Sequence, residues 1–359
     1  MIIAKDNNSY VADAYFSMEE FWSNMNNHEK GSLDGTIWDT YECGERRKLE
    51  SRLAVLYGAP DATVICSGMG AIMTAILAVS AAYQIPIECE KKYGYFENAD
   101  LIENLFKKLG LVREIGIAGV KLIEPITNEP SLRVNLCNLK NSSETGGFSI
   151  IDNSLFSVSA PWKTWSEQIS NPFCVVESLP KYITHSVSGG VVYGEKDVIQ
   201  KIRETARRMG VLLPRHSCIS ILEDKDVNTI KSRLEKMGRN ANLFAQTIRE
   251  ERPELTVRLP QEVAQGAGLQ NVQTSLVFVL YPDELNPMEE FDFWAREVSK
   301  QQERPVVRAG YGWNYTYGRA YGNNKLNTTS GKTYLRFSIG LEDQDTIKQM
   351  AKLLKRVIK

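Results

Sequence analysis

The chain has 359 residues, with 43 lysines and arginines against 44 aspartates and glutamates and a formal net charge of −1. This length is sufficient for two domains, each with a core of its own. Such a balanced charge gives no field that would recruit nucleic acid or an anionic membrane, so we expect neither as a partner.

The metal-binding and membrane signals in the sequence are weak. The six cysteines include no CxxC pair, and the three histidines are too far apart for a helical metal motif. We therefore expect neither a metal site nor a disulfide framework. The amino terminus is polar within a few residues, and no run of about 18 apolar residues occurs. We expect a soluble, cytoplasmic protein.

The amino-terminal segment, residues 1–44, is polar, rich in asparagine and dotted with aromatic residues, without sustained periodicity. This texture is typical of an arm rather than of a core. Residues 45–57 follow, with leucines at helical spacing and charged residues on the other face, which predicts an amphipathic helix. Gly58 ends this helix.

A short apolar run at 62–66 predicts a strand, and the small residues of Ser-Gly-Met-Gly separate it from an apolar helix at 71–83. In this arrangement the N–H groups of Gly68 and Met69 lie at a helix start, where the helix dipole also favours an anion. The turn therefore predicts a phosphate cradle. A structural strand-to-helix turn, ordinary in α/β proteins, explains the pattern equally well.

Further apolar runs alternate with helical stretches, which predicts a mostly parallel sheet with helices on both faces. Ligands of such sheets bind at the carboxyl ends of the strands. The predicted strands are residues 120–124, 149–152, 173–177 and 190–193, with helices at 101–109 and 196–209. The polar side chains at those strand ends, beside the turn at 67–69, are Asn128, Asp152, Ser178 and Lys181.

Lys181 lies between two apolar runs in VVESLPKYITHSVSGGVVYG. A lysine in such surroundings either reaches solvent or loses its charge to desolvation, and a neutral amine is a nucleophile toward aldehydes. This is the chemistry of a Schiff-base lysine that binds pyridoxal phosphate (PLP).

The sequence pattern changes near residue 226. A long helix at 227–251, strand-like LTVRL and SLVFVL, and a helix at 287–300 predict a separate α+β domain. Residues 308–332 look irregular, and the strand TYLRFSIG and a last helix follow. We expect an arm at 1–44, a large domain at 45–225 and a C-terminal α+β domain at 226–359.

Six blocks in this order resemble the Cys/Met-metabolism family of PLP enzymes, the group of cystathionine γ-synthase, cystathionine lyase and methionine γ-lyase. The resemblance implies fold type I, an α/β fold with a mostly parallel sheet flanked by helices and a smaller C-terminal α+β domain. The blocks are LESRLAVLYGAPDATVICSGMGAI, KKYGYF, IEPITNEPSLRV, IIDNSLF, ESLPKYITHSVSGGVVYG and YLRFSIGLED.

The resemblance implies roles around PLP. Lys181 would form the Schiff base and move protons, while Asp152 would pair with the pyridine nitrogen. Tyr93, which precedes a glycine as in the family, would stack on the ring and protonate the leaving group; Tyr95 lies two positions away. The remaining cofactor contacts would come from Gly68, Met69, Ser178 and Asn128, the last of which is also explained as a turn residue.

We expect the substrate contacts to come from the last third of the chain. Arg336 resembles the family arginine that binds the substrate α-carboxylate. The crowded aromatics of GYGWNYTYGRAYGNN, beginning with Tyr311, stand where the family has a Ser-Leu-Gly stretch, and they favour a polar or elongated substrate. A glycine-rich surface loop explains them equally well.

Two further departures from the family are visible. Pro180 stands where the family has a phosphate-binding Ser or Thr. The early Tyr-x-Arg motif, which reaches the phosphate of a neighbouring subunit, has no clean match in GTIWDTYECGERRKLE. The resemblance implies a homodimer or homotetramer, whose active sites are built from two chains.

We expect an enzyme that carries out β- or γ-elimination or replacement on an L-amino acid, sulfur-containing or O-activated. One alternative is a specialised biosynthetic PLP lyase or an aminotransferase with a non-standard substrate. Another is a relative of the fold without catalysis.

Overall fold

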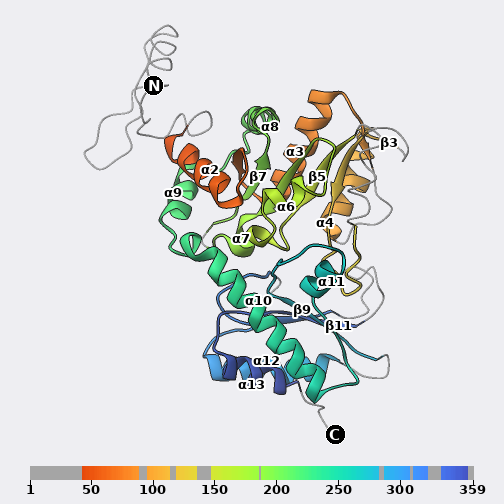
Figure 1. The fold of residues 1–359 in the computed structure, drawn as a ribbon, viewed down its shortest axis with the longest axis vertical. Helices are drawn as coiled ribbons and strands as arrows, with labels where there is room; N and C mark the ends of the chain where they lie inside the picture. Colours follow the sequence, from red (N-terminus) through yellow and green to blue (C-terminus); the bar gives the residue numbers. More distant parts are fainter. Residues whose placement is uncertain are drawn as a thin grey trace, which may run out of the picture.

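The computed structural model describes residues 43–88, 95–113, 119–135, 147–185, 187–282, 287–307, 310–321 and 333–354. Two sheets organise these residues, one in the upper and one in the lower half of Figure 1.

The large sheet has seven strands in the order β1-β7-β6-β5-β4-β2-β3. The strands from β6 to β3 run parallel, and β7 is antiparallel to both of its neighbours. Most strands are almost completely buried, as expected for a sheet covered on both faces. The strands are β1 (Asp61–Ile65), β2 (Ile87–Glu88), β3 (Val112–Arg113), β4 (Val120–Ile123), β5 (Phe148–Asp152), β6 (Phe173–Ser178) and β7 (Gly190–Gly194).

Helices cover both faces of this sheet. On one face, α3 (Gly68–Tyr83), α8 (Lys196–Met209) and η1 (Asp100–Phe106) form a single apolar cluster with the strands. The other face packs against α2 (Gly44–Tyr57) and α9 (Arg215–Glu223). The short helices are α4 (Phe96–Ala99), η3 (Ser157–Ser159), α6 (Trp162–Ser166) and α7 (Leu179–Tyr182).

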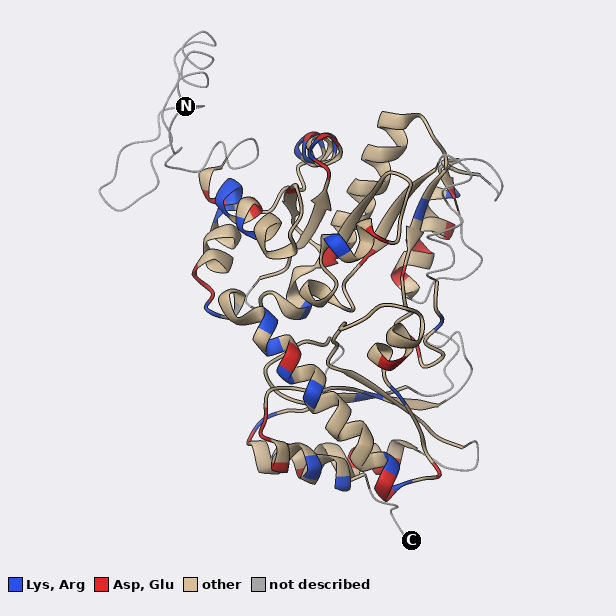
Figure 2. Ribbon diagram, viewed as in Figure 1, with Lys and Arg blue, Asp and Glu red and all other residues tan. Residues whose placement is uncertain are grey.

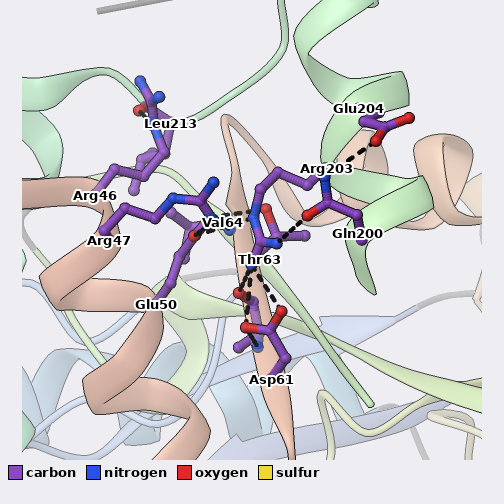
Figure 3. A network of polar contacts seen from close by, with 11 residues as sticks. Arg46, Arg47, Glu50, Asp61, Thr63, Val64, Gln200, Arg203, Glu204 and Leu213 are labelled. Atoms are coloured by element: carbon purple, nitrogen blue, oxygen red, sulfur yellow. Dashed lines mark hydrogen bonds and ion pairs between the residues drawn. The ribbon is translucent and has the colours of Figure 1, made fainter. Parts of the chain in front are cut away.

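A buried polar network joins α2, β1 and α8 (Figure 3). Glu50 is only 2% exposed and accepts hydrogen bonds from Thr63 Oγ1 at 2.8 Å and Arg203 Nε at 3.2 Å. Arg203 also binds Asp61 and the carbonyl of Ala62. The charged face of α2 is therefore partly buried, because Arg203 of α8 pairs with the buried carboxylate of Glu50.

The small sheet is antiparallel, in the order β10-β11-β9-β8. Helix α10 (Asp226–Glu251) runs from the large half to the small one (Figure 1). The apolar core on one face of the small sheet includes residues of α10, α12 (Pro287–Gln302) and α13 (Gln344–Lys352). The remaining elements are β8 (Thr256–Arg258), α11 (Pro260–Gly266), β9 (Leu276–Leu280), β10 (Tyr317–Tyr321) and β11 (Tyr334–Ser338).

The predicted strands and long helices are confirmed, most within two residues of the expected bounds. The interpretation of residues 308–332 as irregular was wrong for Tyr317–Tyr321, which form β10. The domain bounds at 45–225 and 226–359 stay a prediction. Charges of both signs alternate along α8 and α10, whereas the strands carry few (Figure 2). Within the described ranges, no helix is both long and apolar enough to cross a membrane.

Candidate active site

A cavity of about 230 Å³ lies at the carboxyl ends of β4, β5 and β6. This is the position expected for a ligand site of a parallel sheet. The structure brings most of the predicted site residues together there. Those that line the cavity are Gly68, Met69, Asn128, Asp152, Ser178, Lys181 and Tyr311. Arg336 is not among the lining residues, and Tyr93 lies outside the described residues.

The start of α3 forms one wall of the cavity. Ser67 caps this 16-residue helix, since its side chain accepts a hydrogen bond from the N–H of Gly70 at 2.9 Å. Gly68 presses against Ser178, because an added Cβ would lie 2.8 Å from the Ser178 Cβ. Gly68 and Met69 are the first two residues of α3, so their N–H groups lie in the turn where a helix offers no acceptor of its own. They suit an anion at the positive end of the helix dipole.

Lys181 lies in α7, directly after β6. Its Nζ lies 4.4 Å from the ring centroid of Tyr311. Burial, and then the positive charge of Arg336, lower the pKa of Lys181 from 10.5 to about 8, although Asp152 and Glu97 oppose this shift. About one tenth of such an amine is neutral at pH 7, which makes it available as a nucleophile or base.

Asp152 ends β5, in register with Val176 of β6. Its Oδ1 accepts the N–H of Ser154 at 3.0 Å, which fixes the carboxylate at the cavity wall. The charge of the same carboxylate helps raise the pKa of two buried carboxyl groups, those of Glu124 and Glu177. Asp152 is therefore the source of a negative potential in this part of the site.

Asn128 follows β4 and carries a buried Oδ1 without a hydrogen-bond partner in the described part of the chain. An unpaired buried amide oxygen is unfavourable in a folded protein. Since Asn128 also lines the cavity, this oxygen is available to a bound group.

Tyr95 lines the cavity, whereas Tyr93 was the tyrosine favoured from the sequence. The N–H of Tyr95 donates to both carboxyl oxygens of Glu124, at 3.0 and 3.1 Å. Burial and the neighbouring Glu97 raise the pKa of the Tyr95 phenol well above its ordinary value, so the phenol keeps its proton at neutral pH. Tyr95 thus places a protonated phenol at the cavity.

Two buried carboxyl groups were missed from the sequence. Glu124 lines the cavity, and burial followed by the charge of Asp152 raises its pKa to about 7. Glu177 accepts hydrogen bonds from Ser157 at 2.5 Å and Tyr57 at 2.7 Å, and burial raises its pKa to about 8. Both follow apolar strand residues, the same signal that singled out Asp152.

The two predicted substrate residues occupy different positions. Tyr311 is buried beside Lys181, and its hydroxyl donates to the carbonyl of Ser154 at 2.9 Å. Arg336 lies in β11 of the small sheet, and its charge acts on both Lys181 and Tyr95. The site therefore draws on both halves of the chain. Among the described residues, no group of His, Cys, Asp and Glu is arranged to hold a metal ion.

The chain is similar in structure to cystathionine gamma synthase from Xanthomonas oryzae pv. oryzae. The structure in complex with aminoacrylate and cysteine matches with a TM-score of 0.71 and 18% identity, over 92% of this chain and 91% of that chain. The complex with cystathionine gives a TM-score of 0.69, 18% identity and 91% coverage of both chains.

A methionine gamma lyase from Micromonospora echinospora, in its apo form, is also similar, with a TM-score of 0.68 and 21% identity over 88% of this chain and 87% of that chain. No family model and no curated protein matches the sequence. The chain thus shares the fold of this cystathionine gamma synthase and this methionine gamma lyase, which confirms the fold class and the structural resemblance expected from the sequence.

Proposed function

We propose that this protein is a PLP-dependent enzyme that catalyses elimination or replacement at the β or γ carbon of an L-amino acid, sulfur-containing or O-activated. One observation carries the proposal: the amine of Lys181, whose pKa is lowered, shares a cavity with Asp152 and the start of α3. The structural neighbours, a cystathionine synthase and a methionine lyase, agree with this chemistry.

The residues at the cavity fit PLP. The unpaired Oδ1 of Asn128 offers a polar contact to a bound group. The close approach of Gly68 to Ser178 leaves no space for a side chain at the helix start, which keeps the backbone there open to a phosphate. The N–H groups of Gly68 and Met69 and the hydroxyl of Ser178 would bind the phosphate. Asp152 would hold the proton of the pyridine nitrogen.

Pro180 offers the phosphate neither a hydroxyl nor an N–H. Because α7 contains Pro180 in its first turn, the proline instead sets the backbone that leads into Lys181. The start of α3 therefore has the main part in binding the phosphate.

PLP, when bound, supplies the electron sink for the pair left at the substrate α carbon once its proton is removed. The neutral amine of Lys181 would take that proton. Arg336 would hold the substrate α-carboxylate through the fork of its guanidinium. A protonated phenol would then donate to the leaving group; Tyr95 has a place at the cavity for this step, and Tyr93 stays a candidate from the sequence.

Borohydride reduction in the presence of PLP, followed by peptide mass spectrometry, tests the cofactor. We expect a phosphopyridoxyl group on the peptide that contains Lys181. Lys181→Ala should lose it, whereas Lys196→Ala, which changes an exposed lysine of α8, should keep it. Labelling spread over surface lysines, with none on Lys181, would contradict the proposal.

Assays of keto acid, ammonia and thiol with cystathionine, methionine and O-acetyl-L-homoserine then define the reaction. Elimination releases a keto acid together with ammonia, whereas transamination yields a keto acid without ammonia. The aromatic segment at 310–321 supports the alternative of a non-standard substrate, which this assay also tests. Labelling of Lys181 without any turnover would favour a relative of the fold without catalysis.

We also propose a homodimer or a homotetramer, on the resemblance to enzymes with sites built from two chains. Residues 1–42, which contain most of the expected arm, lie outside the described residues. Light scattering coupled to gel filtration tests this assembly, and a strictly monomeric protein would count against it.

A further inference from the structure

One buried carboxyl group of the cavity, that of Glu177 on β6, has no part in the proposed reaction. Glu177 is only 1% exposed and is among the residues that line the cavity. In the described part of the chain, an arginine pairs with the buried carboxyl groups of Glu50 and Glu290, but no cation pairs with Glu177. Its oxygens instead accept hydrogen bonds from the hydroxyl groups of Ser157 at 2.5 Å and Tyr57 at 2.7 Å. Burial of a carboxyl group is costly, so these two bonds are what keep Glu177 in place.

Ser157, the partner of Glu177 in η3, has a strained backbone. Its φ is +49°, in the left-handed region that residues with a side chain rarely adopt. Such a residue keeps this conformation only where its surroundings hold it. Asn153 supplies two of the contacts that do so: its carbonyl accepts the N–H of Ser157 at 2.9 Å, and its Nδ2 donates to the carbonyl of Ser157 at 2.9 Å. The hydrogen bond from the Ser157 hydroxyl to Glu177 supplies the third.

The turn that leads to Ser157 begins at Asp152, the last residue of β5 and the proposed partner of the pyridine nitrogen. The N–H of Asn153 donates to the carbonyl of Val176 on β6 at 2.8 Å, which ties the start of the turn to the strand that carries Glu177. The next N–H group of the turn donates to Oδ1 of Asp152 at 3.0 Å. The backbone of this turn therefore orients the carboxylate of Asp152, and a shift of the turn moves that carboxylate.

Tyr57 connects Glu177 to α2 and to the far side of the turn. Its ring stacks on that of Tyr193 of β7, with the ring centroids 4.2 Å apart. The hydroxyl of Tyr193 accepts a hydrogen bond from Nδ2 of Asn153 at 2.9 Å. These contacts close a ring around Glu177 and the turn after β5. The carboxyl group of Glu177 therefore joins the turn to a helix and a strand from distant parts of the chain.

We propose that Glu177 is a positioning residue that holds Asp152 in place for the pyridine nitrogen of PLP, through its hydrogen bond to Ser157 and the turn between them. This inference rests on the proposed function and adds a residue to it. Glu177 itself touches no reacting atom and acts only through Asp152. Loss of its acceptor oxygens frees the strained turn, and the carboxylate of Asp152 is then no longer fixed.

Binding of PLP and of 1-deaza-PLP to the cofactor-free full chain, measured by isothermal titration calorimetry, tests this role. In the deaza compound a carbon atom replaces the pyridine nitrogen, while the phosphate and the aldehyde stay the same. Only PLP therefore offers a ring nitrogen to Asp152. A hydrogen bond to a charged group predicts that the unchanged protein binds PLP about tenfold to a hundredfold more tightly than the deaza compound. The ratio of the two affinities measures how well Asp152 is placed.

Glu177→Met removes both acceptor oxygens at similar size and should bring this ratio close to one, whereas Glu177→Gln keeps one acceptor oxygen and should keep most of the ratio. Ser157→Ala removes the partner hydroxyl while Glu177 stays, and it should lower the ratio as well. Ser159→Ala is the matched control. It removes a hydroxyl from the same short helix, but that hydroxyl binds the carbonyl of Phe156, so the ratio should not change.

Three results would overturn the inference. The first is equal binding of PLP and the deaza compound by the unchanged protein. The second is a ratio that survives both Glu177→Met and Ser157→Ala, even if each variant binds the two compounds more weakly, since an equal loss reports general damage to the site. The third is a ratio that Ser159→Ala lowers as much as Ser157→Ala does. Failure of Lys181 to be labelled would instead overturn the proposed function.

Discussion

Replacement of Gly312 by alanine is the sharpest test of how the site is held together. Gly312 has a φ of +83°, a conformation that costs a residue with a side chain about 1–2 kcal/mol. An added Cβ would also lie 1.7 Å from the carbonyl oxygen of Lys181 and 2.6 Å from Cδ1 of Tyr182. These contacts are far too close, and because the first is with backbone, the chain itself must move.

Overpacking in a well-packed region costs about 1–3 kcal/mol. Together with the conformational cost, we expect Gly312→Ala to lower the free energy of unfolding by about 2–5 kcal/mol. Gly268→Ala is the matched control: its φ is +96°, but nothing lies within 4 Å of an added Cβ. That variant should lose only the conformational part, about 1–2 kcal/mol.

Urea unfolding followed by tryptophan fluorescence measures both variants, and the phosphopyridoxyl label on Lys181 reports the site. We expect Gly312→Ala to label less than the unchanged protein, because the turn that carries Lys181 is displaced. If Gly312→Ala and Gly268→Ala have equal stability and equal labelling, Gly312 does not position the lysine.

Three other predictions concern buried charges. In the cofactor-free protein, the lowered pKa of Lys181 means that stability rises by about 3 kcal/mol as the pH goes from about 8 to 10.5, and Lys181→Met should lose this rise in urea unfolding. The raised pKa of Glu177 means that stability falls as the pH rises from 4.5 to about 8, and Glu177→Gln should flatten that fall. Parallel curves of stability against pH for the variant and the unchanged protein would refute this prediction. Arg203→Met leaves the carboxylate of Glu50 buried and should lower the free energy of unfolding by about 3 kcal/mol. Adding Glu50→Gln in the double variant should lower the free energy of unfolding by a smaller further amount, which a double-mutant cycle measures.

The fold was readable from the sequence where apolar runs are long and well separated. Residues 196–209, for example, form α8 as expected, because the apolar stripe is clear and Gly210 ends the helix. β10 was missed because its strand alternates large with small residues rather than apolar with polar ones. Gly318 is small there since an added Cβ would lie 2.8 Å from Phe337 and 2.9 Å from Phe291. A glycine in an aromatic segment was therefore a packing requirement and not a loop signal.

The candidate site was predictable to the extent that parallel strands end at one edge. That rule alone places Asn128, Asp152 and Lys181 near one another. It cannot reveal contacts made across the sequence by individual side chains. The hydrogen bond from Tyr57 to Glu177 joins residues 120 positions apart, and it depends on how α2 packs on the large sheet.

The same limit applies to Lys181, whose surroundings come largely from the C-terminal part of the chain. The hydroxyl of Tyr182, the next residue, lies 3.0 Å from the hydroxyl of Thr274. Arg233 of α10 donates to the carbonyl of Tyr182 and to the side chain of Asn314. Gly312, in the aromatic segment at 310–321, packs on the turn that carries Lys181. Three separate parts of the small half therefore hold the turn that carries Lys181, so the position of the lysine depends on contacts that no local sequence pattern contains.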